Sequence, residues 1–445
     1  MSERVPRIGF VSLGCPKALV DTEIILSRLR AEGYRVSPDY EGADLVIVNT
    51  CGFLNEAVEE SLEAVSEALQ ENGRVIVTGC LGSRKNPDGS SFVSKRIPGL
   101  IGVTGPGEYD RVLSLVHENA PRPDLGAFPE VSWRDTRLTP CHYAYLKIAE
   151  GCDNKCTFCI IPQLRGPLVS RKPSDILEEA WRLKEAGVKE LMVVSQDTPA
   201  YGRDVRYAAD FYEGRAIRTH ILDLCGLLGD LGMWIRLHYV YPYPQVDRLV
   251  ELMAKGKVLP YLDVPLQHAH PRVLKAMKRP GNPEKTLEQI KHWREICPEI
   301  TIRSTFIAGF PGETEEEFKY LLDFIREAKL DRVGCFAYSP VDGAAANSLY
   351  PAVPQEIRQE RQRRFMELQS RISEEKLKEK IGTLQDVIID EPEDEDGVAV
   401  GRTKGDAPEI DGVAYVTTSG HLGPGDIVRV RITRTEGPDL VGKAL

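Results

Sequence analysis

Apolar runs alternate with amphipathic stretches along the first third of the chain. Runs rich in branched apolar residues lie at 7–15, 44–51 and 74–80, and helical periodicity fills the segments after the first two. Apolar runs that are bounded by turn residues and separated by helices are typical of buried strands in a parallel sheet. With a weaker strand at 101–104 and a helix at 108–117, the pattern predicts an N-terminal α/β domain over residues 1–120.

The same alternation returns in the middle of the chain. We predict strands at 143–149, 190–195, 234–240, 261–266, 301–307 and 332–338. Ser174 is a candidate N-cap for the first helix, and Thr314 with Glu317 fits a capping box. Six βα units predict a partial, TIM-like (β/α)6 barrel over residues 141–380. Four prolines mark residues 121–140 as a linker.

The last part of the chain has a different composition. A charged helical run at 355–380 is followed by β-branched residues and glycine-containing turns, which predict a small antiparallel β-barrel over residues 381–445. From Leu384 onward there are 13 acidic and 6 basic residues, a net charge of −7. The whole chain carries −10, which does not support a broad nucleic-acid-binding surface.

The composition favours a cytoplasmic protein that uses its cysteines as ligands. The first ten residues contain no apolar signal region, and no run of apolar residues is long enough to span a membrane. Ten cysteines in a chain of this kind favour metal binding over disulfides.

Cys152, Cys156 and Cys159 form the strongest single motif. Three thiolates are one fewer than the usual set for an iron–sulfur cluster, so a [4Fe–4S] cluster held here would keep one iron open for a substrate or cofactor. A zinc site completed by Cys141 or His142 is the alternative, because structural zinc is normally four-coordinate.

A second trio of cysteines follows three of the predicted strands. Cys15, Cys51 and Cys80 each end an apolar run, and the carboxyl ends of parallel strands share one edge of a sheet. We therefore predict a second metal site, against the alternative of three buried apolar thiols. The remaining cysteines, Cys141, Cys225, Cys297 and Cys335, are interpreted as structural.

The spacing of Cys152, Cys156 and Cys159 resembles the signature of the radical S-adenosylmethionine superfamily. The resemblance implies that the open iron chelates the methionine moiety and that an electron from the cluster releases a 5′-deoxyadenosyl radical. It places Phe158 beside the adenine, and Ser195 and Gln196 near the methionine amino group. Two further candidate cofactor contacts lie at or near strand ends, at Gln267 and Arg303. No residue is predicted as a general base.

The runs SLGCPKALVDTE, NTCGFLNEAVEES, VTGCL and EGCDNKCTFCIIP look like those of the methylthiotransferase family. That family carries an additional cluster on three N-terminal cysteines and ends in a β-barrel called TRAM. The resemblance implies two [4Fe–4S] clusters, on Cys15, Cys51 and Cys80 and on Cys152, Cys156 and Cys159. It also implies that sulfur at the cluster on Cys15, Cys51 and Cys80 is methylated by one S-adenosylmethionine. A radical from a second molecule would then abstract a hydrogen from the substrate carbon, and the carbon radical would take the methylthio group.

Two subgroups of this family differ in substrate. One modifies an adenosine of tRNA, and the other modifies the β-carbon of an aspartate in small-subunit ribosomal protein twelve. The acidic barrel suits a basic protein better than RNA, and GRTKGDAPEIDG at 401–412 is similar to the protein-modifying subgroup. We therefore expect the ribosomal protein as partner, an electron donor such as flavodoxin or ferredoxin, and no tRNA. A non-catalytic iron–sulfur adaptor is the alternative of another class.

Overall fold

The computed structural model describes residues 5–123, 136–279 and 281–445, so part of the predicted linker at 121–140 lies outside the described residues. The chain forms two compact units. The first comprises Met1–Thr139, Glu150–Leu168 and Ser339–Ala344, and the second comprises Pro140–Ala149, Val169–Tyr338 and Ala345–Leu445.

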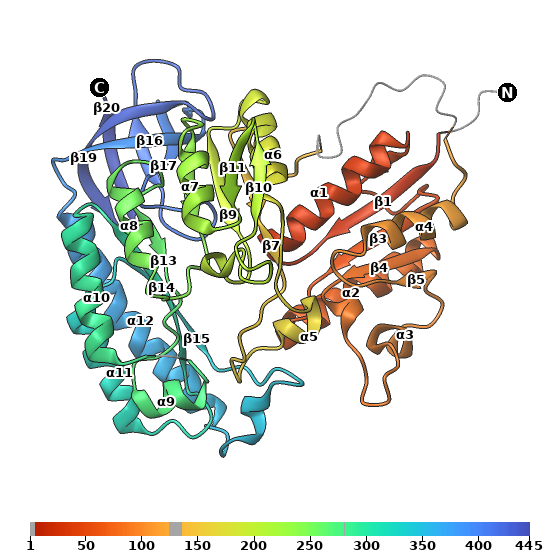
Figure 1. Cartoon of the computed structure of the whole chain (residues 1–445), viewed down its shortest axis with the longest axis horizontal. Coiled ribbons are helices and arrows are strands. Elements are labelled where there is room, and N and C mark those ends of the chain that lie inside the picture. The colour runs from red at the N-terminus through yellow and green to blue at the C-terminus, as the bar shows by residue number, and fades with distance from the viewer. Residues whose placement is uncertain (1–4, 124–135, 280) are drawn as a thin grey trace. The chain divides into compact units, whose positions relative to one another are not determined.

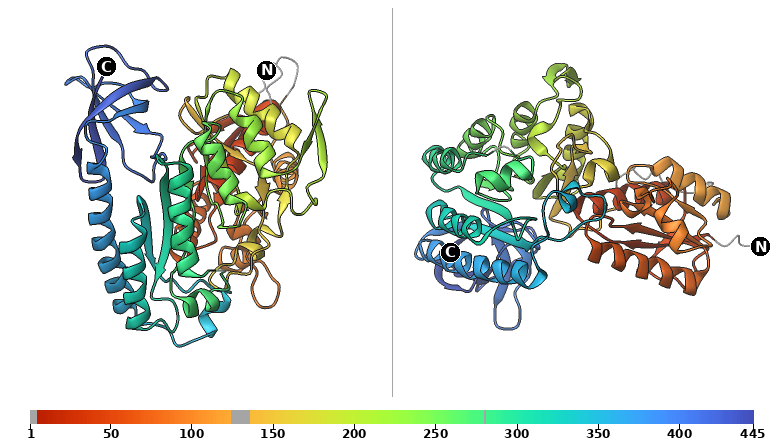
Figure 2. Two further views of the ribbon diagram at one scale, coloured as in Figure 1. Left: turned by 60° about the vertical axis from the view of Figure 1, so that its left-hand side comes forward. Right: turned by 90° about the horizontal axis from the view of Figure 1, so that it is seen from below.

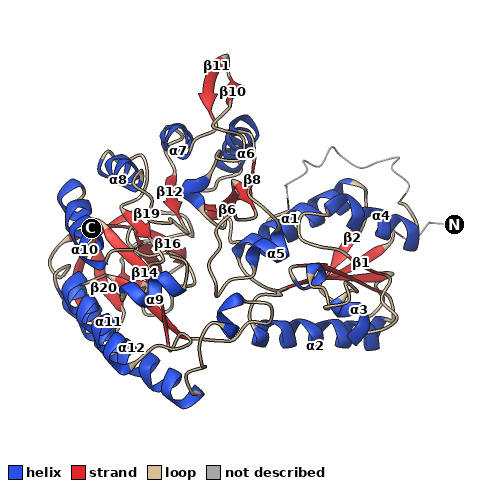
Figure 3. Cartoon of the chain, turned by 60° about the horizontal axis from the view of Figure 1, so that its bottom comes forward, coloured by secondary structure: helices blue, strands red, loops and turns tan. Residues whose placement is uncertain are grey.

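A five-stranded parallel sheet forms the centre of the first unit, with the strand order β2-β1-β3-β4-β5. Figure 3 shows that α1 and α4 cover one face of this sheet and α2 and α3 the other. The elements are β1 (Arg7–Ser12), α1 (Pro16–Ala31), β2 (Arg35–Ser37), β3 (Leu45–Thr50), α2 (Asn55–Asn72), β4 (Val75–Gly79), α3 (Phe92–Arg96), β5 (Gly102–Val103), α4 (Tyr109–Asn119) and α5 (Ile161–Arg165).

Each face of this sheet has its own apolar core. Ile8, Ile47 and Ile76 pack under α1 and α4, whereas Val48 and Val77 pack under α2 and α3. Alternate residues of a strand point to opposite faces, so a strand covered on both sides must be apolar throughout. This accounts for the uninterrupted apolar runs in the sequence, and it confirms the predicted parallel α/β fold.

A curved six-stranded parallel sheet forms the centre of the second unit, in the order β15-β14-β13-β12-β9-β6. All six strands were predicted. They are β6 (Tyr143–Lys147), β9 (Glu190–Val194), β12 (Trp234–Leu237), β13 (Tyr261–Asp263), β14 (Thr301–Ala308) and β15 (Arg332–Ala337).

Helices follow the strands of the second unit and lie along the outside of its curved sheet (Figure 1). They are α6 (Pro173–Glu185), α7 (Ile221–Gly229), α8 (Val246–Ala254), α9 (Pro271–Ala276), α10 (Pro283–Ile296), α11 (Glu315–Ala328) and α12 (Gln355–Lys378). This is the partial (β/α)6 barrel expected from the sequence.

Two local predictions for this unit have different outcomes. The capping box of Thr314 and Glu317 at the start of α11 is confirmed. The N-cap prediction for Ser174 is wrong, because α6 already begins at Pro173. Proline suits a first helical position since it needs no partner for an N–H group. The amide of Ser174 instead donates to Asp210 (2.8 Å), on β10 (Ala209–Tyr212), which forms an unpredicted hairpin with β11 (Arg215–Arg218).

The C-terminal segment closes into the predicted five-stranded barrel, in the order β16-β17-β18-β20-β19. Its strand pairs are antiparallel, as predicted, except that β18 and β20 pair in parallel. Its strands are β16 (Leu384–Glu391), β17 (Val398–Thr403), β18 (Ala414–Thr417), β19 (Ile427–Glu436) and β20 (Asp439–Ala444). In Figure 2 the barrel lies at the end of the long helix α12. No helix in the described part of the chain is both long and apolar enough to cross a membrane.

Candidate metal centre

Cys15, Cys51 and Cys80 lie just past the carboxyl ends of β1, β3 and β4, which are adjacent in the sheet. The amide of Cys80 donates to the carbonyl of Thr50 (3.0 Å), the residue before Cys51. A Cβ atom built on Gly14 would lie 3.4 Å from the Cβ of Cys51. The edge of the sheet therefore brings the three cysteine-bearing turns together, as the strand pattern predicts.

Glycine allows these turns to approach closely. Gly14 has a φ of +107°, a conformation that other residues rarely adopt. A Cβ on Gly52 would lie 2.6 Å from the amide nitrogen of Leu81, so a side chain there would push the turns after β3 and β4 apart.

The three thiols differ in how readily they ionise. Burial opposes ionisation of Cys15, but the charges of Lys17 and Arg165 outweigh it and lower the pKa of this thiol. Burial raises the pKa of Cys51, and it raises the pKa of Cys80 to about 11 although Arg165 opposes the shift. Metal ligation requires thiolates, so a bound metal must displace protons from Cys51 and Cys80.

Arg165 is a charged group in direct contact with this trio. Its Nε–H donates to the sulfur of Cys80 (3.1 Å), and its guanidinium pairs with Asp21 (3.2 Å) and Glu150 (2.9 Å). The side chain is 1% exposed. Burial opposes its charge, but the carboxylates and thiols around it raise the pKa of Arg165 well above its ordinary value.

The loop that carries Cys152, Cys156 and Cys159 belongs to the same compact unit. The amide of Cys152 donates to Gly166 (3.1 Å), and that of Cys159 donates to Cys156 (3.2 Å) in a tight turn. The amide of Ile161 donates to the sulfur of Cys159 (3.4 Å). Backbone bonds thus fix the loop, and Phe158 lies half-buried within it.

The donor atoms of both trios are of the kind that iron–sulfur clusters use. Among residues 5–123, 136–279 and 281–445, no three Cys, His, Asp or Glu side chains are grouped so as to hold one metal ion. The thiolates of a [4Fe–4S] cluster bind different irons, so they need not converge on one point. The donor sets contain sulfur alone, and backbone and guanidinium N–H groups donate to two of the sulfurs, which suits such clusters.

The cysteines and histidine outside the trios have other surroundings. Cys225, Cys297 and Cys335 are buried, and Cys141 is exposed. His142 was the alternative zinc ligand, but its Nε2 lies 2.7 Å from Asp390 of the terminal barrel. The imidazole of His142 is therefore bound to a carboxylate of the second unit, whereas Cys152, Cys156 and Cys159 belong to the first unit.

The other predicted cofactor residues lie in the second unit. Ser195 and Gln196 directly follow β9, and the hydroxyl of Ser195 lies 3.2 Å from that of Thr198. Gln267 has a φ of +72° and a backbone bonded on both sides to β14. A non-glycine residue held in this conformation at a strand end is a feature that clusters at functional sites. These three residues lie at the carboxyl edge, as predicted.

Arg303 is placed differently. It is the third residue of β14, and its guanidinium pairs with Asp263 (3.0 Å) and with Asp411 of the terminal segment (3.5 Å). Two carboxylates therefore hold this guanidinium, and its contact with a cofactor stays a prediction.

The segment 401–412 contacts the first residues of several strands of the second sheet. Arg402 pairs with Glu190 (2.7 Å), the first residue of β9, and Glu190 also pairs with Arg236 (2.7 Å). Tyr261 donates to Asp411 (2.7 Å) in the same region. Several acidic residues of the terminal barrel are therefore occupied inside the second unit.

Sequence reasoning missed three charged residues of the first unit. Asp21, Glu150 and Arg165 all stand inside or beside the cysteine motifs, and their spacing gave no sign that they meet. A signal existed in retrospect, because each is a charge within a segment that otherwise reads as buried or metal-bound.

Three family profiles match the chain. They are the Radical SAM superfamily over residues 146–325, the Uncharacterized protein family UPF0004 over residues 7–95 and the TRAM domain over residues 381–445. Membership of the radical SAM superfamily implies S-adenosylmethionine and a [4Fe–4S] cluster.

The fold is similar to that of the radical S-adenosylmethionine methyltransferase TsrM from Kitasatospora setae. One structure of TsrM, with cobalamin and [4Fe-4S] cluster bound, gives a TM-score of 0.53 at 15% identity, covering 76% of this chain and 77% of that chain. A second, with tryptophan substrate and a SAM analog, gives 0.51 at 15% identity, covering 85% and 78%. Fold and cysteine pattern together define a radical SAM protein that ends in a TRAM barrel.

Full-length relatives narrow this class. The chain is 58% identical to ribosomal protein uS12 methylthiotransferase RimO of Proteus mirabilis, over 99% of this chain and 98% of the relative. It is 56% identical to the protein of the same name from Ralstonia nicotianae, over 100% and 99%, and 58% identical to that from Escherichia fergusonii, over 98% of each. The chain belongs to the RimO family of methylthiotransferases, which transfer a sulfur-containing group.

Proposed function

We propose that this protein attaches a methylthio group to the β-carbon of an aspartate in ribosomal protein uS12. The similarity to uS12 methylthiotransferases over nearly the whole chain carries the choice of substrate. The two cysteine trios within one compact unit support two [4Fe–4S] clusters, on Cys15, Cys51 and Cys80 and on Cys152, Cys156 and Cys159. When bound, these clusters supply an electron to S-adenosylmethionine at one site and an iron that carries sulfur at the other.

The chain's own residues act as ligands and as holders of the cofactor. The six cysteines bind as thiolates, and the buried position of Cys80 keeps water from its sulfur. Ser195, Gln196 and Gln267 at the carboxyl edge of the second sheet are proposed to contact S-adenosylmethionine, with Phe158 beside its adenine. Arg303 is the weakest of these candidates because Asp263 and Asp411 already bind its guanidinium.

The acidic docking surface is proposed to be smaller than the barrel's charge implies. Asp390, Asp406 and Asp411 are buried or paired inside the second unit. Glu391, Asp394, Glu395 and Asp396 are exposed, so these four carboxylates are the ones we assign to contact with the basic protein. A cytoplasmic location and an electron donor such as flavodoxin or ferredoxin complete the proposal.

The tRNA-modifying alternative is not favoured by the relatives. An assay of both substrates side by side tests the choice directly. We expect reduced, reconstituted protein with S-adenosylmethionine to modify uS12 and to release 5′-deoxyadenosine. Modification of tRNA alone would refute the substrate, and failure to form 5′-deoxyadenosine would favour a non-catalytic iron–sulfur adaptor.

A further inference from the structure

Arg165 connects segments that are far apart in the sequence of the first unit. It lies at the end of α5, after the loop with Cys152, Cys156 and Cys159, and donates its Nε–H to Cys80 at the end of β4. Its buried guanidinium therefore touches a predicted ligand of one cluster from the segment that carries the ligands of the other.

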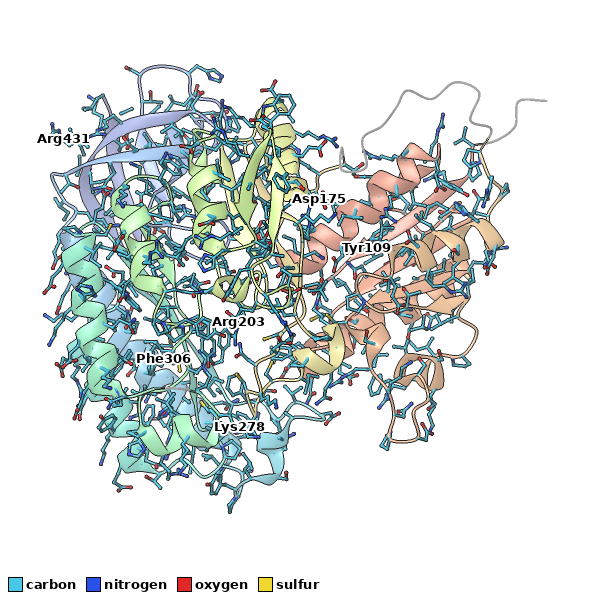
Figure 4. The ribbon with its side chains drawn as sticks, in the orientation of Figure 1. Tyr109, Asp175, Arg203, Lys278, Phe306 and Arg431 are labelled. Atoms are coloured by element: carbon cyan, nitrogen blue, oxygen red, sulfur yellow. The ribbon has the colours of Figure 1, made fainter. Side chains whose placement is uncertain are left out.

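Both carboxylates that hold Arg165 are tied to cysteine-bearing segments. Asp21 lies on α1, which begins directly after Cys15, and its other oxygen accepts the hydroxyl of Tyr109 (2.6 Å; Tyr109 is labelled in Figure 4). Glu150 lies two residues before Cys152 and also accepts the amide of Gly151 (3.1 Å). The arginine is thus fixed from both sides, and its Nε–H has a defined direction toward sulfur.

We infer that Arg165 is a positioning residue for the cluster on Cys15, Cys51 and Cys80, which holds Cys80 in place and tunes that cluster through the N–H···S bond. This inference rests on the proposed function, since that function supplies the cluster. It goes further by assigning a role to a residue that binds no metal itself.

The chemistry of arginine explains why this side chain suits the role. Its planar fork can bind two carboxylates while a third N–H points elsewhere, whereas lysine offers one compact ammonium group. An N–H donor to a cluster sulfur stabilises the more negative, reduced state and so raises the reduction potential. If Arg165 acted only as a buried ion pair, a lysine that keeps the charge beside the same carboxylates would leave the potential near its original value.

The test uses the full chain with the other cluster removed. In a Cys152→Ala, Cys156→Ala, Cys159→Ala background, the remaining iron and its electron paramagnetic resonance spectrum belong to the cluster on Cys15, Cys51 and Cys80 alone. Arg165→Lys keeps the charge but not the directed Nε–H. Arg402→Lys is the matched control, because Arg402 is equally buried and pairs with two carboxylates but touches no cysteine.

We expect the background protein to bind about four irons. Arg165→Lys should lower the midpoint potential, change the spectrum and speed the loss of iron to a chelator by about tenfold or more. Arg402→Lys should leave all three unchanged. Asp21→Asn, which retains Arg165 but removes one of the two carboxylates that hold it, should speed the loss of iron by less than Arg165→Lys does, and it serves if Arg165→Lys does not fold.

Two results would overturn the inference in different ways. If the background binds iron, Arg165→Lys matches its potential and spectrum, and neither Arg165→Lys nor Asp21→Asn loses iron faster, then Arg165 is structural and the two-cluster proposal survives. If the folded background binds no iron, there is no second cluster, and the proposed function fails along with the inference.

Discussion

Arg165 in the first unit and Arg402 in the second are built in the same way but contact different chemistry. The two side chains are 1% and 2% exposed, and each is held by a pair of carboxylates. Arg165 gives its remaining N–H to the sulfur of Cys80, whereas Arg402 lies beside the ring of Tyr143 and the backbone of Asp406.

The comparison separates two uses of a buried charge. Around Arg402 the charges fasten the terminal barrel to the amino-terminal ends of the strands, the end of such a fold that usually serves stability. Around Arg165 the same kind of pairing lies at the carboxyl edge of a sheet, among predicted metal ligands. Substitutions should therefore affect stability in the second unit and both stability and cofactor properties in the first.

The largest effect is expected from Glu190→Ala in the second unit. Glu190 is fully buried between Arg236 and Arg402, so its removal leaves two guanidinium groups without this partner. Breaking a buried ion pair costs about 3–5 kcal/mol, and the iron content should not change. Denaturant unfolding measures the free energy of unfolding, and iron analysis measures the iron content. Glu367→Ala, in an exposed pair with Arg363, is the control. If Glu190→Ala also lost iron, the buried charges of the second unit would not serve stability alone, as proposed.

Asp21→Asn should reduce stability by less than Glu190→Ala, but unlike that variant it should lose iron faster to a chelator. It removes one charged partner of Arg165 while Glu150 remains, and a hydrogen bond to a charged group contributes about 2 kcal/mol. Hydrogen exchange of β1 and β3 should report the loss. Asp110→Asn is the control, since its pair with Arg28 is exposed. Unchanged exchange in both variants would mean that the Arg165 network contributes little to the first unit.

Asp263 makes the stability of the second unit sensitive to acid. Burial opposes its charge, but the bond to His238 and the charge of Arg303 outweigh it and lower the pKa of Asp263 to about 2. A carboxyl with a lowered pKa in the folded state adds stability above about pH 4. This contribution is lost as the pH falls toward 2.

The difference between the wild-type chain and Asp263→Asn isolates this term. We expect up to about 2 kcal/mol of the unfolding free energy to vanish between pH 5 and pH 2 in the wild-type chain beyond the loss in the variant. Unfolding curves at a series of pH values would show it. Parallel pH profiles for the two proteins would contradict the role of Asp263.

The smallest effect is expected from Thr314→Ala, which touches neither arginine network. Thr314 caps α11 by accepting the amide of Glu317 (3.3 Å), and such a cap is worth about 1 kcal/mol. Thermal unfolding should show this modest loss, with no change in iron content or spectrum. Thr314→Ala shows how much stability a purely local change in the second unit costs. If it lost as much stability as Glu190→Ala, the large effect of Glu190→Ala could not be assigned to the buried ion pairs.

Much of the fold could be predicted because buried parallel strands have a simple sequence signature. All six strands of the second sheet and the strands before Cys15, Cys51 and Cys80 follow from apolar runs with turn residues at their ends. The closed barrel follows from β-branched residues and glycine turns. The closeness of Cys15, Cys51 and Cys80 follows from topology alone, because the carboxyl ends of parallel strands lie at the same edge of a sheet.

Other features depend on contacts that sequence spacing does not encode. Arg165 and Asp21 are 144 residues apart, and no spacing in the sequence shows that the two side chains meet. The packing of Glu150–Leu168 with the first unit is equally non-local. Ser174 failed as an N-cap because Pro173 starts the helix and Asp210, from an unpredicted hairpin, takes the serine amide.

The central claim is that the two cysteine trios perform different parts of one reaction. The most direct measurement is product analysis of the Cys15→Ala, Cys51→Ala, Cys80→Ala protein after reconstitution, reduction and incubation with S-adenosylmethionine and uS12. We predict about four irons, continued formation of 5′-deoxyadenosine and no methylthio group on the uS12 aspartate. Methylthiolated uS12 at the wild-type level would contradict the account.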